Sequence, residues 1–257
     1  MADGEEAPNP ANEVVSFGTT VMNLRYGVSD RFNLSASLPY LNISSDKFQG
    51  AEYSRANNGF GDLVITGQYA VMTSPQLTLE AGLELPTGSV DETDDFGQRI
   101  CDILSLGSGT VDPVLGMSIW VPKFGTQNLD MVASLRHRFS GGQNKWGYAF
   151  GDLTLLTAHW TYKMSTAGRF GVRFEGWHSE GDTWYDNTVP ERGASILYVG
   201  PTLAWTFSPA LTVGGFAKFP TLMQLEGAQM LSPVIFGFEF SSSLTDVFKG
   251  IRGQESE

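Results

Sequence analysis

The feature that most constrains this chain is a two-residue period of apolar side chains along almost its whole length. Over 31–41, apolar residues occupy every second position from Phe32 to Tyr40, and the same alternation recurs at 62–71 and 77–85. Successive side chains of a strand point to opposite faces, so each segment has one apolar face and one polar face. The pattern predicts eleven strands, near 13–28, 31–41, 62–71, 77–85, 112–121, 128–139, 151–163, 168–178, 196–207, 210–220 and 232–242.

Two of these segments change the parity of their apolar positions midway. In 13–28 the apolar set moves from Phe17 to Met22, and in 151–163 it moves from Leu155 to Leu156. An extra residue in one strand of a pair reverses the faces of all the residues that follow it. We therefore expect a bulge in each of these two strands.

The connections between the strands alternate between short and long. The short ones lie at 29–30, 74–76, 122–128, 165–168 and 208–210, and the long polar ones at about 42–59, 87–110, 140–149, 179–195 and 221–231. Strands of about ten residues cross a bilayer when tilted, and short turns at one end with long loops at the other are typical of bacterial outer-membrane barrels. The sequence predicts an all-β, antiparallel, up-and-down transmembrane barrel of about twelve strands.

The composition of the chain excludes several classes of function. The net charge of −12 argues against nucleic-acid binding, which needs a basic surface. A single cysteine, Cys101, excludes an intrachain disulfide and a cysteine-rich zinc site, and we expect no metal and no cofactor. The first ten residues lack the basic and apolar regions of a signal peptide, and no window is apolar enough for a helical membrane span.

A soluble barrel is the main structural alternative, with its apolar face inward. Its charged face, which includes Glu84, Arg136 and Arg138, would then face water, and one interior would have to hold six large rings. These rings lie near the short-turn ends of their strands, where an outer-membrane barrel carries an aromatic girdle. The membrane barrel accommodates both faces, so we expect interfacial positions for Tyr26, Tyr69, Trp120, Trp160, Tyr162 and Trp205.

Four stretches resemble a known family in the same order along the chain. They are "LRYGVSDRFNLSASLPYL" at 24–41, "NNGFGDLVITGQYAV" at 57–71, "LEAGLELPTGS" at 79–89 and "LGSGTVDPVLGMSIW" at 106–120. These segments are similar to bacterial outer-membrane barrels of the phenol meta-pathway degradation (MetA-type) family, described as transporters of hydrophobic compounds. The resemblance covers about half of the chain and implies a Gram-negative outer-membrane barrel that passes small, often aromatic or apolar, molecules.

The chain departs from this family pattern in its strand number. Bacterial single-chain barrels have an even number of strands, whereas eleven are countable here. The twelfth would come from a strand preceding residue 13 or from "LTDVFKGIR" at 244–252. By domain, we expect an N-terminal segment at 1–12, the barrel at 13–242 and a polar tail at 243–257.

The polar face supplies the candidate functional residues. With the long loops outside the cell, eight inward charges are expected near the outer rim: Asp62, Glu84, Asp112, Arg136, Arg138, Asp152, Arg173 and Glu175. Other residues expected to face the lumen are Arg25, Arg31, Glu80, Asp130, His159, Arg169, Lys218 and Glu239. Mixed charges of this kind either line a constriction for polar solutes or form ion pairs that brace a plugged lumen. Both interpretations stay open at this point.

The tetrapeptide "FGDL" occurs twice, at 60–63 and 150–153, and each copy follows a long loop. We interpret it as the entry of a wall strand. The phenylalanine is expected at the outer interface, the aspartate as the first inward residue and the leucine as the first outward one. "TVDPVL" at 110–115 repeats the pattern with Asp112 inward.

Alternative functions rest on weaker signals. The acidic stretch "SVDETDDFGQ" at 89–98 is either a solvated loop or a calcium site, but it lacks the spacing of an EF-hand. His178 and Ser179 suggest a lipid hydrolase, but adjacent strand residues point to opposite faces, so we expect no enzyme. A non-transporting docking barrel is the third class. The expected partners are outer-membrane lipid, lipopolysaccharide, a small solute and periplasmic or surface proteins.

Overall fold

A computed structural model describes residues 14–46, 55–94, 97–190, 192–227, 229 and 234–243. The predicted segments at 1–12 and 244–252 lie outside the described residues, as does nearly all of the predicted tail. The wall consists of the strands β1 (Val14–Gly27), β2 (Phe32–Asp46), β3 (Arg55–Phe60), β4 (Leu63–Thr73), β5 (Gln76–Leu85), β6 (Asp112–Val121), β7 (Leu129–Arg138), β9 (Leu153–Lys163), β10 (Gly168–Ser179), β13 (Ala194–Ser208), β14 (Leu211–Leu225) and β15 (Ile235–Ser242).

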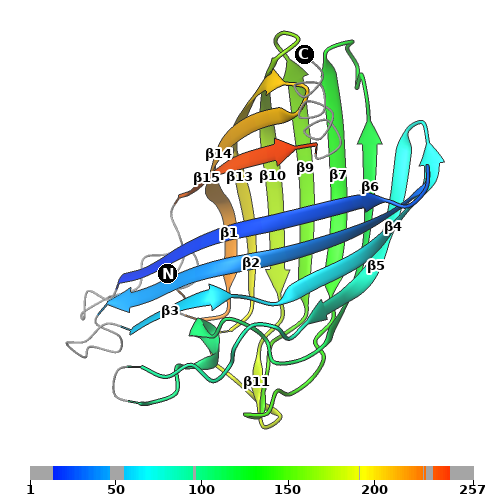
Figure 1. Ribbon diagram of the computed structural model, residues 1–257. Helices are drawn as coiled ribbons and strands as arrows, with labels where there is room; N and C mark the ends of the chain where they lie inside the picture. The colour runs from blue at the N-terminus through cyan, green and yellow to red at the C-terminus, as the bar shows by residue number, and fades with distance from the viewer. Residues whose placement is uncertain are drawn as a thin grey trace, which may run out of the picture.

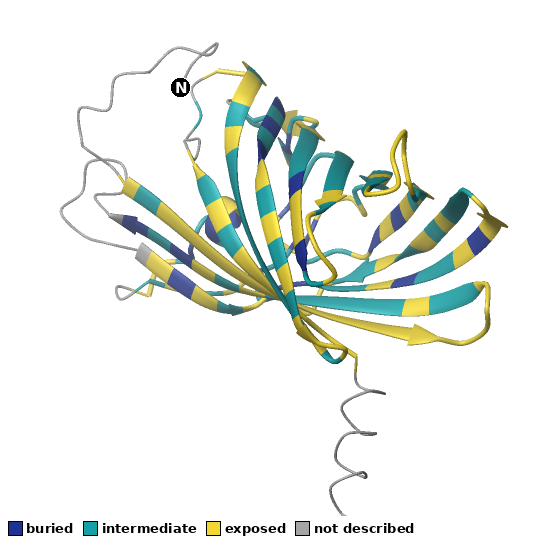
Figure 2. Ribbon diagram, turned by 90° about the horizontal axis from the view of Figure 1, so that it is seen from above, coloured by how far each residue is buried: buried dark blue, intermediate teal, exposed yellow. Residues whose placement is uncertain are grey.

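These strands form one antiparallel sheet that follows the chain. The order is β1-β2-β4-β5-β6-β7-β9-β10-β13-β14-β15, and β3 continues the position of β4 beside β2. The sheet curls so that β1 and β2 pass in front of the strands from β6 to β10 (Figure 1). Seen from above, the strands enclose a common interior (Figure 2). The prediction of an all-β up-and-down barrel with eleven countable wall strands is confirmed.

The two end strands of the sheet, β1 and β15, run in the same direction because an odd number of strands alternates between them. Within the described part of the chain no backbone ladder joins them. That part also contains no helix long and apolar enough to cross a membrane.

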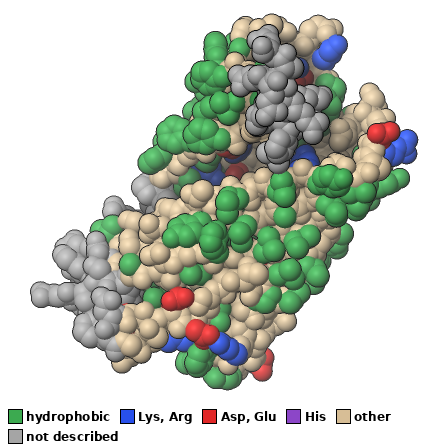
Figure 3. All heavy atoms as spheres, viewed as in Figure 1, with side chains coloured by type: hydrophobic (Ala, Val, Ile, Leu, Met, Phe, Trp, Pro, Cys, Tyr) green, Lys and Arg blue, Asp and Glu red, His purple; other side chains and the backbone are tan. Residues whose placement is uncertain are grey.

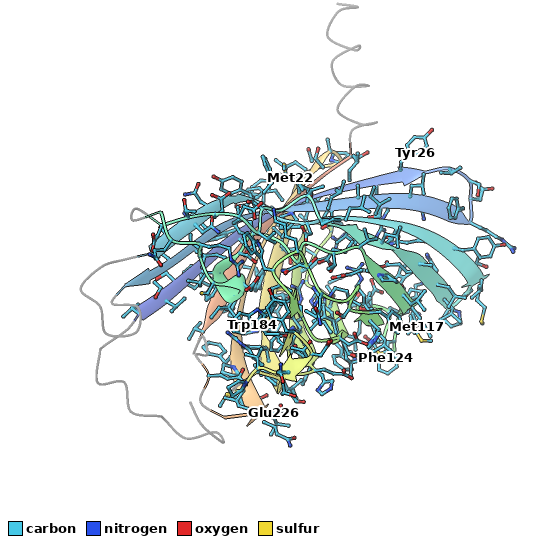
Figure 4. The ribbon with its side chains drawn as sticks, turned by 90° about the horizontal axis from the view of Figure 1, so that it is seen from below. Met22, Tyr26, Met117, Phe124, Trp184 and Glu226 are labelled. Carbon is cyan, nitrogen blue, oxygen red and sulfur yellow. The ribbon has the colours of Figure 1, made fainter. Side chains whose placement is uncertain are left out.

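The outer face of the wall is apolar. Three phenylalanines of β15, Phe236, Phe238 and Phe240, are about three-quarters exposed, and Met22 and Tyr26 of β1 are also exposed. Figure 3 shows apolar side chains spread over the wall, with charged ones gathered near its ends. In Figure 4, Tyr26 projects away from the interior. A sheet with an apolar outer face and inward-facing charges is stable in a nonpolar environment.

A sharp boundary crosses this outer face near the long loops. One lateral row of residues in register is polar: His137, Thr154, His178, Ser195 and Gln224. The next row toward the short turns has no polar side chain: Leu135, Leu156, Gly176, Leu197 and Leu222. Between this boundary and the ring of Tyr162, β9 spans about 26 Å along the strand, or about 20 Å along the axis at a tilt of about 40°. That height is close to the apolar band of an outer-membrane barrel.

The two predicted bulges are not where the parity changes. β1 pairs with β2 in one unbroken register, and β9 pairs with both neighbours in the same way. The parity changes because Phe17 and Leu155, although apolar, lie on the inner face near the long-loop end. Register shifts occur instead at 70–72, 197–198 and 206–208. The break between β3 and β4 adds a further one-residue offset beside β2, because Tyr40 pairs with Phe60 whereas Ser37 pairs with Val64.

The long loops are folded against one another at one end of the barrel. β8 (Tyr148–Ala149), β11 (Thr183–Trp184) and β12 (Asn187–Thr188) form a small antiparallel sheet from two of these loops. The loop at 86–111 carries a short 3-10 helix, η2 (Asp102–Leu104). Together these loops form a cap, which we call the loop cap, at the lower end of Figure 1. Trp184 lies in this cap in Figure 4.

Candidate functional site: the ion-paired and loop-lined interior

Charged side chains of the inner face pair across intervening strands. The Arg136 Nη2 atom lies 2.6 Å from Glu80 Oε1, although β6 runs between their strands. The β6 residue at that height is Gly116, which pairs with Glu80 on one side and Arg136 on the other. A Cβ atom there would lie 3.5 Å from the Glu80 Cβ atom and 3.1 Å from the Leu135 carbonyl oxygen. The glycine therefore leaves room for the ion pair to pass over it.

Two further ion pairs line the opposite part of the wall. The Lys218 ammonium donates to Glu175 at 2.5 Å, and the Arg173 guanidinium donates to Glu239 at 2.9 Å. Both cations also lie over the ring of Phe216, at 5.9 Å and 5.2 Å from its centre. Each pair skips at least one strand, so its members approach each other on the concave side of the sheet.

The remaining predicted inner residues lie nearer the short turns. The Asp130 carboxylate pairs with Lys163 at 2.7 Å and accepts a hydrogen bond from the Lys123 backbone amide. A histidine on the next strand, His159, has its Nε2 atom 2.8 Å from the Thr202 hydroxyl. In the strand register, Arg25 lies opposite Ser35, and Arg169 lies opposite Lys163 and Ala204. Arg31 is exposed in the turn before β2.

Near the loop cap, three of the eight predicted rim charges form one cluster, which we call the rim cluster: Glu84, Asp112 and Arg138. The Arg138 Nη1 atom lies 3.4 Å from Glu84 Oε1 and 3.8 Å from Asp112 Oδ2. Its Nη2 atom donates to the Gly151 carbonyl at 3.1 Å. Asp112 is 1% exposed, so its charge depends on these protein partners. Arg136, Arg173 and Glu175 belong to the three separate ion pairs described above, so the predicted rim charges do not form a single cluster.

The aspartate of the first "FGDL" copy, Asp62, holds a loop. Its two carboxylate oxygens accept hydrogen bonds from the backbone amides of Gly88 and Ser108, at 2.8 Å and 2.6 Å, and from the Ser108 hydroxyl at 2.9 Å. Asp112 acts similarly by accepting from the Gly141 amide at 2.8 Å. Both carboxylates are buried and fasten the long loops to strand entries.

The second "FGDL" copy is oriented differently. β9 begins at Leu153, which shares the inner face with Arg138, so the predicted outward position of this leucine is wrong. The Asp152 carboxylate accepts from the Ser140 amide at 2.7 Å and lies 3.3 Å from His137 Nε2, on the outer face. The prediction that Asp152 faces the lumen is therefore also wrong. It fastens a loop as the other aspartates do, but from the outer side of the wall.

The loop at 86–111 folds into the mouth of the barrel. Ile100 and Leu104 are buried and pack against Ile43 and Leu41 on the inner face of β2. The Asn57 amide donates to the Leu104 carbonyl at 2.9 Å. This packing explains why the inner face of β2 turns apolar near the long loops.

A cavity of about 400 Å³ lies between this loop and the wall. The wall contributes mainly apolar side chains, and the loop adds apolar side chains and serine hydroxyls. The rim cluster contributes two of the charged members, Glu84 and Arg138, and Asp62 lies beside them. Its apolar lining includes Pro39, Leu41, Val64, Ile103, Leu106 and Phe150.

The loop cap is held by its own polar contacts. Arg99 binds Asp102 through both terminal nitrogens, at 3.1 Å and 2.7 Å, and this hydrogen bonding raises the pKa of the guanidinium. Lys145 pairs with Asp91 and lowers the pKa of that exposed carboxyl. The buried Tyr148 hydroxyl donates to Asp182 at 2.5 Å, and burial raises the pKa of the phenol above its ordinary range.

The acidic stretch at 89–98 does not gather a metal site among its described members. Asp91 is engaged by Lys145 and Trp146, and Asp94 accepts from the Gln98 amide at 2.9 Å. Residues 95 and 96 lie outside the described part. No group of three potential ligands for a metal ion occurs in the ranges that the structure describes.

Five of the six predicted interfacial aromatics lie on the outer face near the short turns, and Trp120 is the exception. It pairs with Gln76 and Val132 and shares the face of Asp112, because side chains two residues apart along β6 point the same way. The predicted outer position of Trp120 is wrong. This ring lies on the inner face at the short-turn end instead.

His178 and Ser179 do not contact each other as a hydrolase pair would, in agreement with the expectation that adjacent strand residues point to opposite faces. The Ser179 hydroxyl donates to the Glu180 carbonyl, whereas His178 Nδ1 lies 2.8 Å from the Ser195 hydroxyl. A nucleophilic serine needs a base that a third group orients, and none of the described contacts supplies that group to His178. His178 and Ser195 instead form part of the polar row at the boundary of the outer face.

The sequence pattern did not indicate the residues of the inserted loop that line the cavity, above all Ile103, Leu106 and Ser108. The signal was present as "ILSL" at 103–106, an apolar stretch inside a connection that was otherwise polar. The predicted outer-interface position of Phe150 is wrong, because this residue lines the cavity.

Comparison with known proteins agrees with this architecture. Nineteen chains of solved structures match, and one is a crystal structure described as an outer membrane channel from Pseudomonas putida F1, with 15% sequence identity and a TM-score of 0.61. The match covers 89% of this chain and 82% of that one, and it shows a shared fold. No curated protein matches. The model of the family described as "Putative MetA-pathway of phenol degradation" matches residues 10–221, so the chain belongs to that family.

Proposed function

We propose that this chain forms a channel in the outer membrane of a Gram-negative bacterium and passes small hydrophobic or aromatic molecules. The observation that carries the proposal is the division of the wall into an apolar outer face and an ion-paired inner face. A soluble barrel needs the opposite arrangement, because it fills its interior with apolar side chains. The partners are then outer-membrane lipid and lipopolysaccharide on the outside and a small solute within.

The family and the matching channel structure support the same function. The family description refers to phenol degradation, which agrees with a small aromatic solute. The apolar lining of the cavity beneath the inserted loop gives such a solute a place to leave water at the mouth. The chain acts in this proposal as a passive route and performs no chemical step.

Swelling of liposomes that contain the purified protein tests this function. We expect faster swelling with small neutral solutes than in protein-free liposomes, with a steep decline as solute size increases. A matched pair of solutes of similar size, one aromatic and one sugar-like, separates an apolar route from a general pore. Swelling rates equal to those of protein-free liposomes for every solute would favour a closed barrel braced by its ion pairs.

A further inference from the structure

A groove of about 530 Å³ lies on the outer face of the wall, at the boundary between its polar and apolar rows. It extends over the strands from β9 to β14, and most of its lining comes from the two rows. The apolar row contributes Leu156, Gly176, Leu197 and Leu222, and the polar row contributes Thr154, His178, Ser195 and Gln224. Its volume is within the range of small-molecule sites, about 300 to 1,000 Å³. We call this feature the boundary groove.

A glycine forms the floor of the boundary groove. Gly176 lies between Leu156 of β9 and Leu197 of β13 in the apolar row. Neighbouring strands are about 5 Å apart, so the two leucines stand about 10 Å apart across the glycine and leave room for one hydrocarbon chain. A Cβ atom at Gly176 would lie 3.6 Å from the Leu156 Cβ atom, which is an ordinary contact. The wall therefore does not need a glycine here for its own packing.

The polar side of the groove offers hydrogen-bonding groups that are still available. His178 Nδ1 lies 2.8 Å from the Ser195 hydroxyl, and the Nε2 atom of the same ring has no partner among the described residues. The Gln224 side chain, which is exposed, makes no hydrogen bond within the described ranges. A primary amide has two donor hydrogens and an acceptor oxygen, so this row can both donate and accept. Polar groups at the edge of an apolar band favour a ligand that satisfies them there.

The chemistry of the polar row restricts the ligand. The row contains no lysine or arginine, the side chains that bind phosphate most strongly, so a phosphate at this height has no cation to pair with. The ester linkages of a glycerophospholipid offer acceptors only. An acyl chain that is joined through an amide and carries a hydroxyl group offers both donors and acceptors, which matches the imidazole, hydroxyl and amide groups of the row.

From this combination we infer that the boundary groove binds one acyl chain of an outer-leaflet glycolipid with amide-linked, hydroxylated chains, the chemistry of lipid A in lipopolysaccharide. The chain lies over Gly176 between Leu156 and Leu197, and its amide and hydroxyl groups meet His178 and Gln224. This inference rests on the proposed outer-membrane function, because the long-loop end then faces the leaflet that holds lipopolysaccharide. It adds a fixed lipid position on one side of the barrel, from β9 to β14.

Native mass spectrometry of the full-length protein, released from detergent micelles, tests the inference. The probes are lipid A and phosphatidylethanolamine, each added over the same range of concentrations. We expect one lipid A molecule to be retained, with a dissociation constant at least fivefold lower than that of phosphatidylethanolamine. Fivefold is about the change expected for one additional hydrogen bond.

Two substitutions of the same kind locate the binding. Gly176→Leu fills the groove and is expected to weaken lipid A binding at least tenfold. Gly215→Leu makes the same change elsewhere on the outer face, where Gly215 pairs with Leu203 and Phe238 and a Cβ atom would again make ordinary contacts, at 3.7 Å. This control should bind lipid A as the wild type does.

A third variant tests the polar side of the groove separately from its shape. Gln224→Leu removes the amide and keeps a side chain of similar size. It should bring lipid A down to the affinity of phosphatidylethanolamine and leave the affinity for phosphatidylethanolamine unchanged.

The inference is overturned if the wild type binds both lipids equally, or if Gly176→Leu binds lipid A as the wild type does. A change in the proportion of dimers in Gly176→Leu, without a change in lipid binding, would show that a second copy of the chain occupies the groove instead. Liposome swelling keeps this inference apart from the channel function, because filling a groove on the outer face should leave the swelling rate unchanged. A protein that passes solutes but does not prefer lipid A refutes the groove alone, and one that prefers lipid A but passes no solute refutes the channel alone.

Discussion

The inserted loop depends on Asp62, and replacing this residue by asparagine should release the loop from the mouth. The asparagine amide keeps one acceptor oxygen, so at least one of the bonds to Gly88 and Ser108 is lost along with the negative charge. Hydrogen bonds to a charged group contribute about 1.5–3 kcal/mol each, so losing the two bonds from Ser108 costs about 3–6 kcal/mol. Even the lower value shifts the equilibrium between the closed and open loop by about 100-fold, since 1.4 kcal/mol corresponds to a factor of ten.

Trypsin cleavage after Arg99 measures this equilibrium. Arg99 lies in the loop with its side chain about one-quarter exposed and bound to Asp102, so cleavage requires local opening. When opening is fast relative to cleavage, the cleavage rate follows the open population. We expect Asp62→Asn to be cut at this bond on the order of 100-fold faster than the wild type, with the product followed by mass spectrometry.

The matched control is Asp130→Asn, the same change at the other end of the barrel. Asp130 binds Lys163 and the Lys123 amide and contacts no part of the inserted loop in the described structure. Its cleavage rate after Arg99 should match that of the wild type. An Asp62→Asn protein that remains folded and is cut at the wild-type rate would refute the view that this carboxylate holds the loop.

Three further predictions follow from the wall and the loop cap. Ala133→Arg on the outer face should lower the free energy of unfolding in lipid by about 2–4 kcal/mol, the cost of an arginine at the bilayer midplane. Ser134→Arg on the inner face should lower this free energy less. Urea unfolding of the two variants in lipid compares them. Gly116→Val should destabilise the barrel by about 1–3 kcal/mol in the same assay, because its Cβ crowds the Leu135 carbonyl. Burial raises the pKa of Tyr148, so the stability that this tyrosine gives the loop cap is present below the ordinary tyrosine pKa of about 10 and is lost as the pH rises beyond it. Hydrogen-exchange protection of β8 should therefore fall above that pH in the wild type and not in Tyr148→Phe.

The wall was predictable because strand periodicity is a local property. The polar and apolar positions of β4 up to Ala70, and those of β5, could be assigned to a face from their neighbours two residues away, and these assignments agree with the register. Assignments failed where a strand begins or ends. Asp152 precedes the first paired residue of β9, and the alternation no longer fixes its direction there.

The loop-lined mouth was not predictable in the same way. Ile100 and Leu104 meet Ile43 only because a loop folds back over more than fifty residues of chain, and such contacts leave no periodic trace. The ion pairs were only partly foreseeable. Glu80 and Arg136 were both placed inward, but their pairing depends on the glycine of β6 that lies between them.

Single-channel recording of the wild-type protein in planar bilayers tests the central claim most directly. A barrel with an apolar outer face and an ion-paired interior should insert spontaneously and produce discrete, reproducible current steps. The inserted loop narrows the mouth, so Asp62→Asn should give larger steps than the wild type. A protein that is shown to be inserted but passes no current, in either form, would contradict the account.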